Sequence, residues 1–273
     1  MIGRLERRTG YTILVVATLI AALPLAGVVL MALGPSGNTG GTLSAGSATH
    51  LGNFATVWRM AGFGQSLKAS AIIAISTVLI AVVVSVPAGY ALATMRFRGR
   101  SVLFYLLLLG MLVPLEAMIV PLYFDLRRFG LTGSYWSVIL PDAALSVAFG
   151  SFWMRAFFLS TPRSLVEAAR LDGANVLTTL YRVLLPLARP QMTTLAVLVF
   201  VWTWNDFLLP LVMLSGSDIN TAPISLVFFQ SQHTTNYTYL AAAAILTVLP
   251  VVAVYVLLQR SFTRGILSGA LKG

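Results

Sequence analysis

The chain contains no cysteine and only two histidines among its 273 residues. The absence of cysteine excludes disulfide bonds and thiol catalysis, but it does not indicate a cellular compartment. His50 and His233 lie far apart in sequence, both in predicted loops, and they lack the spacing of metal ligands. Spacing leaves serine–histidine catalysis open, but nothing indicates it. We therefore expect no metal site, no cofactor bound by this chain and no catalytic site of its own.

Charged residues are scarce as well. They make up 10% of the chain, against 58% hydrophobic residues, which is far more apolar than a typical soluble domain. Apolar runs of about 20 residues recur, the length that a helix needs to cross about 30 Å of hydrocarbon. The strict alternation of a membrane β-barrel strand is missing from these runs. We predict an all-α membrane protein, a single transmembrane domain over residues 1–273, with spans at about 11–33, 67–93, 102–126, 136–159, 192–214 and 239–258.

The positions of lysine and arginine predict the orientation of these spans, because such residues are enriched in cytoplasmic loops. If six helices alternate, most of them share one side: Arg4, Arg7, Arg8, Arg96, Arg98, Arg100, Arg163, Arg170, Arg182, Arg189, Arg260, Arg264 and Lys272. Arg127 and Arg128 fall on the other side and are exceptions to the rule, and the larger set of basic residues decides the orientation. Both termini and the segment 160–190 are therefore expected in the cytoplasm. The net charge of +10 comes mostly from these loop residues, which mark the orientation of the spans, so we expect no nucleic-acid surface.

Each predicted span contains a proline, which removes a backbone donor and tends to kink a helix. The prolines are Pro24, Pro87, Pro114, Pro121, Pro141, Pro210 and Pro250. Kinks of this kind suit a bundle that is irregularly packed, and they equally suit a translocator whose helices must bend. The prolines alone do not decide between the two.

The segment 160–190 is a polar insert in an otherwise apolar chain. Thr161 and Pro162 can serve as N-cap and first helical residue, or Ser164 and Glu167 can form a capping box. A short helix over 165–171 would then end at Gly173, and a second helix over 176–184 would end at Pro186. The small side chains of Ala168 and Ala169 would let another surface approach closely. The alternative is an amphipathic loop on the lipid headgroups, where Arg170 and Arg182 would meet phosphate.

The same insert carries a family pattern. Glu-Ala-Ala, a glycine four residues later and an aliphatic-x-Leu-Pro resemble the EAA loop of permease subunits in binding-protein-dependent ABC importers. The matching residues are Glu167, Ala168, Ala169, Gly173, Val183, Leu185 and Pro186, and Asp172 and Ala174 extend the match. Phe97-Arg98-Gly99-Arg100, Trp204-Asn205-Asp206-Phe207-Leu208 and the stretch from Gln259 to Gly273 resemble the sugar-transporting branch, in particular its smaller six-span permease of the maltose type.

This resemblance implies a type I importer permease fold in a bacterial-type cytoplasmic (inner) membrane. It implies a heterodimer with a second permease, a dimer of ATPase subunits that bind ATP and magnesium, and an extracytoplasmic binding protein that delivers a sugar or sugar derivative. In such systems the EAA helix fits a cleft on the ATPase, so residues Glu167–Ala174, with Val183, Leu185 and Pro186, would dock there. The tail residues Gly269, Lys272 and Gly273 would lie near the ATPase. Which sugar is carried is not indicated.

Charged residues inside spans are costly and are therefore candidates for function. Glu116 falls in the third predicted span, Asp142 in the fourth and Asp206 in the fifth, beside Trp204 and Asn205. Sugars are bound by hydrogen bonds and by stacking on aromatic faces, so Glu116, Trp204, Asn205 and Asp206 are our candidates for the substrate pathway. Alternatively, these groups satisfy kinked backbone or pair across the permease interface. An ion-coupled secondary transporter would also need such carboxylates, but the sequence shows no convincing internal repeat.

Overall fold

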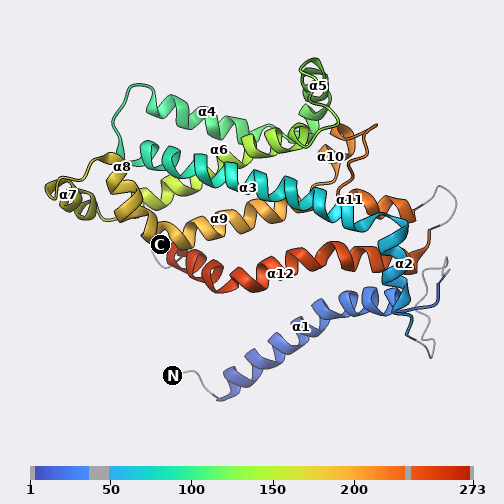
Figure 1. Cartoon of the computed structure of the whole chain (residues 1–273). Helices are drawn as coiled ribbons and strands as arrows, with labels where there is room; N and C mark the ends of the chain where they lie inside the picture. The colour runs from blue at the N-terminus through green and yellow to red at the C-terminus, as the bar shows by residue number, and fades with distance from the viewer. Residues whose placement is uncertain (1–3, 37–48, 231–234, 271–273) are drawn as a thin grey trace. The chain divides into compact units, whose positions relative to one another are not determined.

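The computed structural model describes residues 4–36, 49–230 and 235–270, and within these ranges it describes the side chains from Arg8 to Gln259. All the regular elements in this part of the chain are helices, apart from one isolated bridge between Gln230 and Thr235 (Figure 1). The predicted all-α fold is confirmed. The chain divides into two compact units: unit 1 is Met1–Gly64 with Ile224–Pro250, and unit 2 is Gln65–Pro223 with Val251–Gly273. The predicted single domain stays a prediction.

Unit 1 contains α1 (Arg4–Ala32), α2 (Gly52–Met60), the 3-10 turn η2 (Leu226–Phe229) and the first part of α12 (Tyr237–Ala270). The apolar side chains of α1 are largely exposed, as suits a helix that faces lipid. Polar contacts hold the helix ends together. The buried Asn53 amide donates to the carbonyls of Ala32 and Gly34, each at 2.9 Å, and the Thr238 hydroxyl donates to the Pro35 carbonyl at 3.0 Å.

Unit 2 is built around α3 (Phe63–Thr94), α6 (Trp136–Ser160) and α9 (Leu185–Asn205), with α4 (Arg100–Leu112) packed on α6 (Figure 1). α3 and α6 approach each other very closely at two glycines. A Cβ atom on Gly89 would lie 2.6 Å from the Cβ of Met154. One on Gly150 would collide with the side chain of Ser85. Small residues at helix crossings are how membrane helices bring their backbones together.

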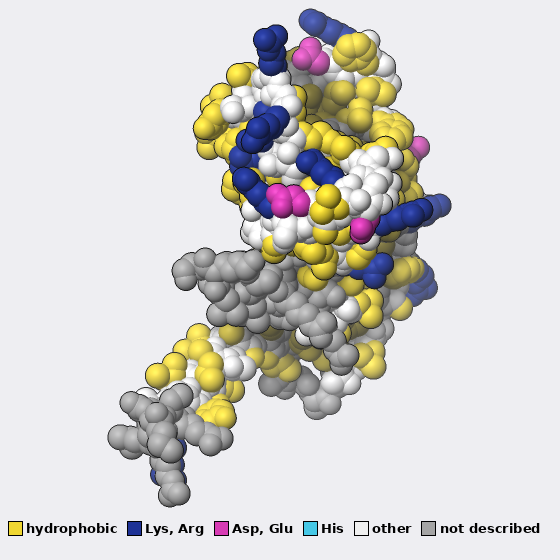
Figure 2. Space-filling view, turned by 90° about the vertical axis from the view of Figure 1, so that its left-hand side faces the viewer, with side chains coloured by type: hydrophobic (Ala, Val, Ile, Leu, Met, Phe, Trp, Pro, Cys, Tyr) yellow, Lys and Arg dark blue, Asp and Glu magenta, His cyan; other side chains and the backbone are white. Residues whose placement is uncertain are grey.

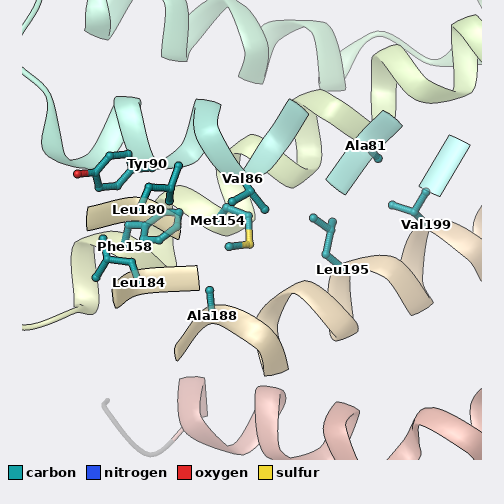
Figure 3. Close-up of a cluster of buried hydrophobic side chains, with 10 residues drawn as sticks. All are labelled: Ala81, Val86, Tyr90, Met154, Phe158, Leu180, Leu184, Ala188, Leu195 and Val199. Atoms are coloured by element: carbon teal, nitrogen blue, oxygen red, sulfur yellow. The ribbon is translucent and has the colours of Figure 1, made fainter. Parts of the chain in front are cut away.

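A buried hydrophobic cluster fills the space between these helices (Figure 3). Its members come from α3, α6, α9 and the segment before α9: Ala81, Val86, Tyr90, Met154, Phe158, Leu180, Leu184, Ala188, Leu195 and Val199. Tyr90 and Phe158 meet edge to face at 5.5 Å between ring centroids. The cluster therefore joins the segment 176–184 mechanically to three long helices.

Arg155 lies beside this cluster on α6. Its Nε donates to the carbonyl of Leu92 on α3 at 3.3 Å, and its guanidinium lies 4.0 Å from the ring centroid of Phe104 on α4. A cation over an aromatic face is stabilising, more so where water is excluded. Arg155 thus cross-links three helices.

The third predicted span, 102–126, is wrong as a continuous helix. α4 ends at Leu112, and α5 (Leu115–Arg128) continues at an angle of 99° to it. The break follows from Pro114, which disfavours helical backbone at the preceding residue, and Val113 is indeed extended with ψ 119°. Among the residues that the structure describes, five helices are long and apolar enough to cross a membrane, and the number is six if this bent pair counts as one span.

The fifth predicted span, 192–214, is also interrupted. α9 ends at Asn205, and a short helix, α10 (Leu208–Met213), follows after Asp206. At its other end the helical stretch begins earlier than expected, at Val176.

Candidate functional site

The helix α7 (Arg163–Leu171) stands at one end of unit 2 and is the predicted EAA helix (Figure 1). Its N-terminus differs from our prediction. Pro162 is extended and precedes the helix, no side chain caps it, and the Thr161 hydroxyl donates to the Phe157 carbonyl at the end of α6. The Thr161 cap does not form because the Thr161 hydroxyl bonds to the end of α6, and the Ser164 capping box does not form because α7 already begins at Arg163.

α7 ends at Leu171, and Gly173 stops it, as predicted. Gly173 has a positive φ of 81°. Its N–H donates to the carbonyl of Arg170 at 3.0 Å, and the N–H of Ala174 donates to the carbonyl of Ala169 at 2.9 Å. This pair of bonds is a Schellman motif, which satisfies the free carbonyls at the end of a helix. Residues 163–174, which we call the coupling segment, therefore form a rigid unit closed by its own backbone.

Replacing Gly173 by alanine tests this cap. A Cβ at Gly173 would meet no atom within 4 Å, so the substitution strains only the left-handed backbone, at a cost of about 1–2 kcal/mol. We expect faster hydrogen–deuterium exchange of the amides in the coupling segment, measured by mass spectrometry in detergent. Gly27→Ala in α1, where a Cβ also meets no atom within 4 Å, should leave that exchange unchanged. Equal exchange in both variants would contradict the cap.

The outer surface of the coupling segment is partly apolar. Glu167 and Ala168 are exposed, and Leu171 is 89% exposed. Ala169, however, is only 7% exposed, so Ala168 is the more exposed of the two alanines, and docking at both stays a prediction. Ala168 and Ala169 are one residue apart and therefore point about 100° apart around the helix. Leu171 lies within the predicted docking range Glu167–Ala174, although it is not one of the residues that match the family pattern.

The predicted second helix of the insert does not end at Pro186. The one-turn helix α8 (Val176–Thr178) and the π-helical segment η1 (Thr179–Leu184) run directly into α9, with Pro186 in its first turn. Proline has no backbone N–H to donate, and it lies here where the π-helical segment passes into α9 and the regular hydrogen-bond pattern is already interrupted. Asn175, which sequence reasoning missed, caps this helix by accepting the Thr178 N–H at 2.8 Å. Asn-x-x-Thr is an ordinary N-cap signal.

The segment around η1 connects the coupling segment to the bundle. Val166 of α7 packs against the buried cluster of Figure 3, and so do Val183 and Leu185. These last two residues matched the family pattern and are partly buried, so they help to support the coupling segment. Their docking on the ATPase stays a prediction.

Arginine side chains gather at this end of unit 2 (Figure 2). Arg96 and Arg98, between α3 and α4, are exposed, as are Arg163 and Arg170 on α7. The α3–α4 turn and α7 lie at the same end (Figure 1), as an alternating arrangement of spans requires. The side of the membrane on which they lie stays a prediction.

A cavity of about 580 Å³ lies near the opposite end of unit 2. It is bounded by the α4–α5 break, by α6 and by the end of α9; its lining includes Pro114, Asp142, Ser146, Phe149, Trp202, Asn205 and Asp206. We call it the α4–α6–α9 cavity. Of our four pathway candidates, Asn205 and Asp206 line it.

The other two pathway candidates lie elsewhere. Trp204 is 3% exposed and stacks on Phe200 at 5.4 Å between centroids, while Trp202, two residues earlier, lines the cavity. Glu116 is exposed in the first turn of α5 and does not line the cavity. Asp142, which we noted but did not place in the pathway, lines the cavity.

Some polar side chains of the cavity lining already form hydrogen bonds with backbone atoms of the chain. The Asn205 amide donates to the Val201 carbonyl at 2.8 Å, and one Asp206 oxygen, Oδ1, accepts the Leu209 N–H at 3.4 Å. These bonds agree with the alternative that such groups satisfy kinked backbone, and the substrate role of the two residues stays a prediction. The other oxygen of Asp206 and Oδ2 of Asp142 are buried without a hydrogen-bond partner.

Comparison with known proteins identifies the family. Residues 85–268 match the model of the binding-protein-dependent transport system inner membrane component. The arabinooligosaccharides transport system permease protein AraQ of Halalkalibacterium halodurans is 34% identical over 263 residues, covering 93% of this chain and 92% of that protein.

A second relative and a solved structure agree with this match. The trehalose transport system permease protein SugB of Mycobacterium tuberculosis is 31% identical over 255 residues, covering 93% of each chain. One chain of a bacterial ABC transporter that imports the acidic polysaccharide alginate has the same fold, with a TM-score of 0.77, 24% identity and coverage of 96% of this chain and 99% of that one. The chain therefore belongs to the family of inner membrane components of binding-protein-dependent transport systems.

Proposed function

We propose that this chain is a permease subunit of an ATP-driven importer and that it translocates a sugar or sugar derivative. The observation that carries the proposal is the family match over residues 85–268, which contains both the coupling segment and the α4–α6–α9 cavity. The sugar is supported by the relatives, whose names state transport of arabinooligosaccharides and of trehalose. The chain itself performs no chemistry on the solute.

The coupling segment is the proposed docking site for the ATPase. Its exposed side chains include the charged Arg163, Glu167, Arg170 and Asp172 and the apolar Ala168 and Leu171. Its C-terminal end is held by backbone bonds, and Val166 packs against the buried cluster. ATP can shift the bundle between two states only through a difference in its interaction energy with them. A rigid segment packed on the buried cluster can transmit that difference to α3, α6 and α9.

The proposed assembly has the partners of the family. It contains a second permease, a dimer of ATPase subunits carrying ATP and magnesium, and an extracytoplasmic binding protein. Both termini and the coupling segment would lie in the cytoplasm, with the chain in the inner membrane. Gly269 falls within α12 near its end, whereas Lys272 and Gly273, proposed to lie near the ATPase, are outside the described residues.

Uptake by the reconstituted importer tests the function. The chain is co-expressed with its candidate partners, purified in mild detergent and placed in liposomes with maltose, trehalose, arabinobiose or diacetylchitobiose as the solute. We expect uptake of at least one sugar that requires ATP inside the liposome and stops when the ATPase subunit is omitted. Uptake that persists without the ATPase and follows a proton or sodium gradient would show an ion-coupled transporter instead.

A further inference from the structure

The α3–α4 turn forms a pocket to which the proposed function gives no role. The pocket has a volume of about 580 Å³ and is lined by residues 96–102, between the end of α3 and the first turn of α4. This volume falls within the usual range of small-molecule sites, about 300–1,000 Å³. Gly99 turns the chain with a φ of 84°, and Nη1 of Arg100 donates to the Met95 carbonyl at 3.1 Å, which ties the two sides of the turn together. We call it the α3–α4 pocket.

Three arginines make this pocket positive. Arg96 and Arg98 are exposed, and Arg100 is half-buried. Within the described part of the chain no acidic residue lines the pocket, and the recorded ion pair joins Arg128 and Asp125 on α5. Arg100 is also the first residue of α4, where the helix dipole is positive and a cation is unfavourable. An anion in the pocket would relieve the repulsion among these groups.

An apolar face of α4 continues directly from the pocket. Val102 belongs to both, since it lines the pocket and is 63% exposed. On the other side of the helix, Phe104 stacks on Phe152 of α6 at 6.3 Å between centroids. The 13 residues of α4 span about 20 Å, enough to cover one leaflet of a hydrocarbon layer about 30 Å thick. The exposed apolar face has the spacing of one side of a helix and consists of Val102, Leu103, Tyr105, Leu106 and Leu109.

We propose that the α3–α4 pocket binds the phosphate of an anionic phospholipid whose acyl chains lie along the exposed face of α4. Guanidinium groups donate paired hydrogen bonds to phosphate oxygens, and basic pockets at the ends of membrane helices are a known way to hold anionic head groups. The lipid lies in the leaflet on the side of the coupling segment, because the α3–α4 turn and α7 lie at the same end of unit 2 (Figure 1).

Two other occupants match only part of this surface. A soluble anion would fill the pocket and leave the apolar face of α4 without a role. An ATPase surface lies in water, so it could meet the arginines but not side chains at the depth of the hydrocarbon. The orientation of the spans accounts for basic residues in this turn, but it requires neither a pocket nor an apolar face beneath it. A phospholipid meets the charged and the apolar surface together.

Photolabelling of the assembled importer tests the proposal. The importer is placed in phosphatidylcholine nanodiscs with increasing amounts of a phosphatidylglycerol that carries a diazirine at the start of one acyl chain. After irradiation, mass spectrometry quantifies the label on residues 96–109. We expect Arg96→Gln and Arg98→Gln each to raise the mole fraction of phosphatidylglycerol that gives half-maximal labelling about fivefold, and the pair about 30-fold, since each basic residue at a membrane surface contributes about that factor. Arg100 is left in place because it closes the turn.

The controls separate charge at this turn from charge elsewhere. Arg96→Lys/Arg98→Lys keeps the charge and should retain most of the labelling. Arg127→Gln/Arg128→Gln removes the same charge from the exposed end of α5 and should leave the labelling unchanged. Glycerol 3-phosphate carries the phosphate without acyl chains and should not compete.

Several results would overturn the proposal. One is an equal half-maximal fraction in the unmodified importer and in the Arg96→Gln/Arg98→Gln variant, and another is equal labelling by a matching phosphatidylcholine probe. Labelling that glycerol 3-phosphate abolishes would show a site for soluble anions. Loss of the ATPase from the glutamine variant with unchanged labelling would show a protein contact, and absence of label from the unmodified importer would mean that a partner subunit covers the turn. None of these results depends on which solute is carried.

Discussion

Replacing Leu171 by aspartate is expected to abolish most sugar uptake by the assembled importer and to release the ATPase during purification. Leu171 is 89% exposed at the end of α7, where nothing in unit 2 covers it. Burying a leucine side chain in a partner contributes about 1.5–3 kcal/mol, which corresponds to an affinity change of roughly 10- to 150-fold. A buried, unpaired carboxylate in its place adds a further penalty. The measurement is the amount of ATPase that co-purifies with the permease, together with ATP-dependent uptake.

The matched control is Leu51→Asp. Leu51 is also a highly exposed leucine, at 69%, but it precedes α2 in unit 1 and belongs to no part of the coupling segment. This variant should retain the ATPase in full. If Leu171→Asp retains the ATPase and transports as well as the unmodified protein, α7 is not the docking helix.

Replacing Gly89 by alanine is expected to destabilise the bundle by about 1–3 kcal/mol, the usual cost of overpacking a well-filled interior. The added methyl group would lie 2.6 Å from the Cβ of Met154 and 2.8 Å from the backbone nitrogen of Arg155. Neither atom can move without moving α6 itself. The measurement is the midpoint of thermal unfolding in detergent, which should fall, along with the yield of monodisperse protein.

Gly110→Ala is the control for this second substitution. Gly110 lies inside α4, and a Cβ there would meet no atom within 4 Å. Alanine favours a helix over glycine by up to about 1 kcal/mol, so this variant should be as stable as the original or slightly more so. Equal unfolding midpoints for the two variants would refute the close packing of α3 on α6.

Local chemistry explains which parts of the fold could be predicted. The helical stop at Gly173 depends on one residue with a left-handed backbone, and the sequence indicates it directly. Prolines are harder to interpret. Pro87 and Pro141 lie inside long helices, Pro114 breaks one, and Pro186 lies in the first turn of another. Their surroundings in the fold, rather than their presence, decide among these outcomes.

In the candidate site, too, some residues could be identified from the sequence and others only from the fold. Asn205 and Asp206 could be chosen as polar residues inside an apolar run, and both line the cavity. The sequence could not decide whether Trp202 or Trp204 lines the cavity. Residues two apart in a helix point about 200° apart, and only the packing of the neighbouring helices decides which of them faces the cavity. Asp142 takes its role from α4 and α9, which lie far from it in sequence.

The Schellman closure of α7 uses main-chain atoms only, and no side chain caps either end of the helix. The side chains of Glu167, Ala168 and Leu171 therefore take no part in capping the helix that carries them. If α7 docks on the ATPase as proposed, substitutions at these three positions can change its affinity for the ATPase without unfolding α7.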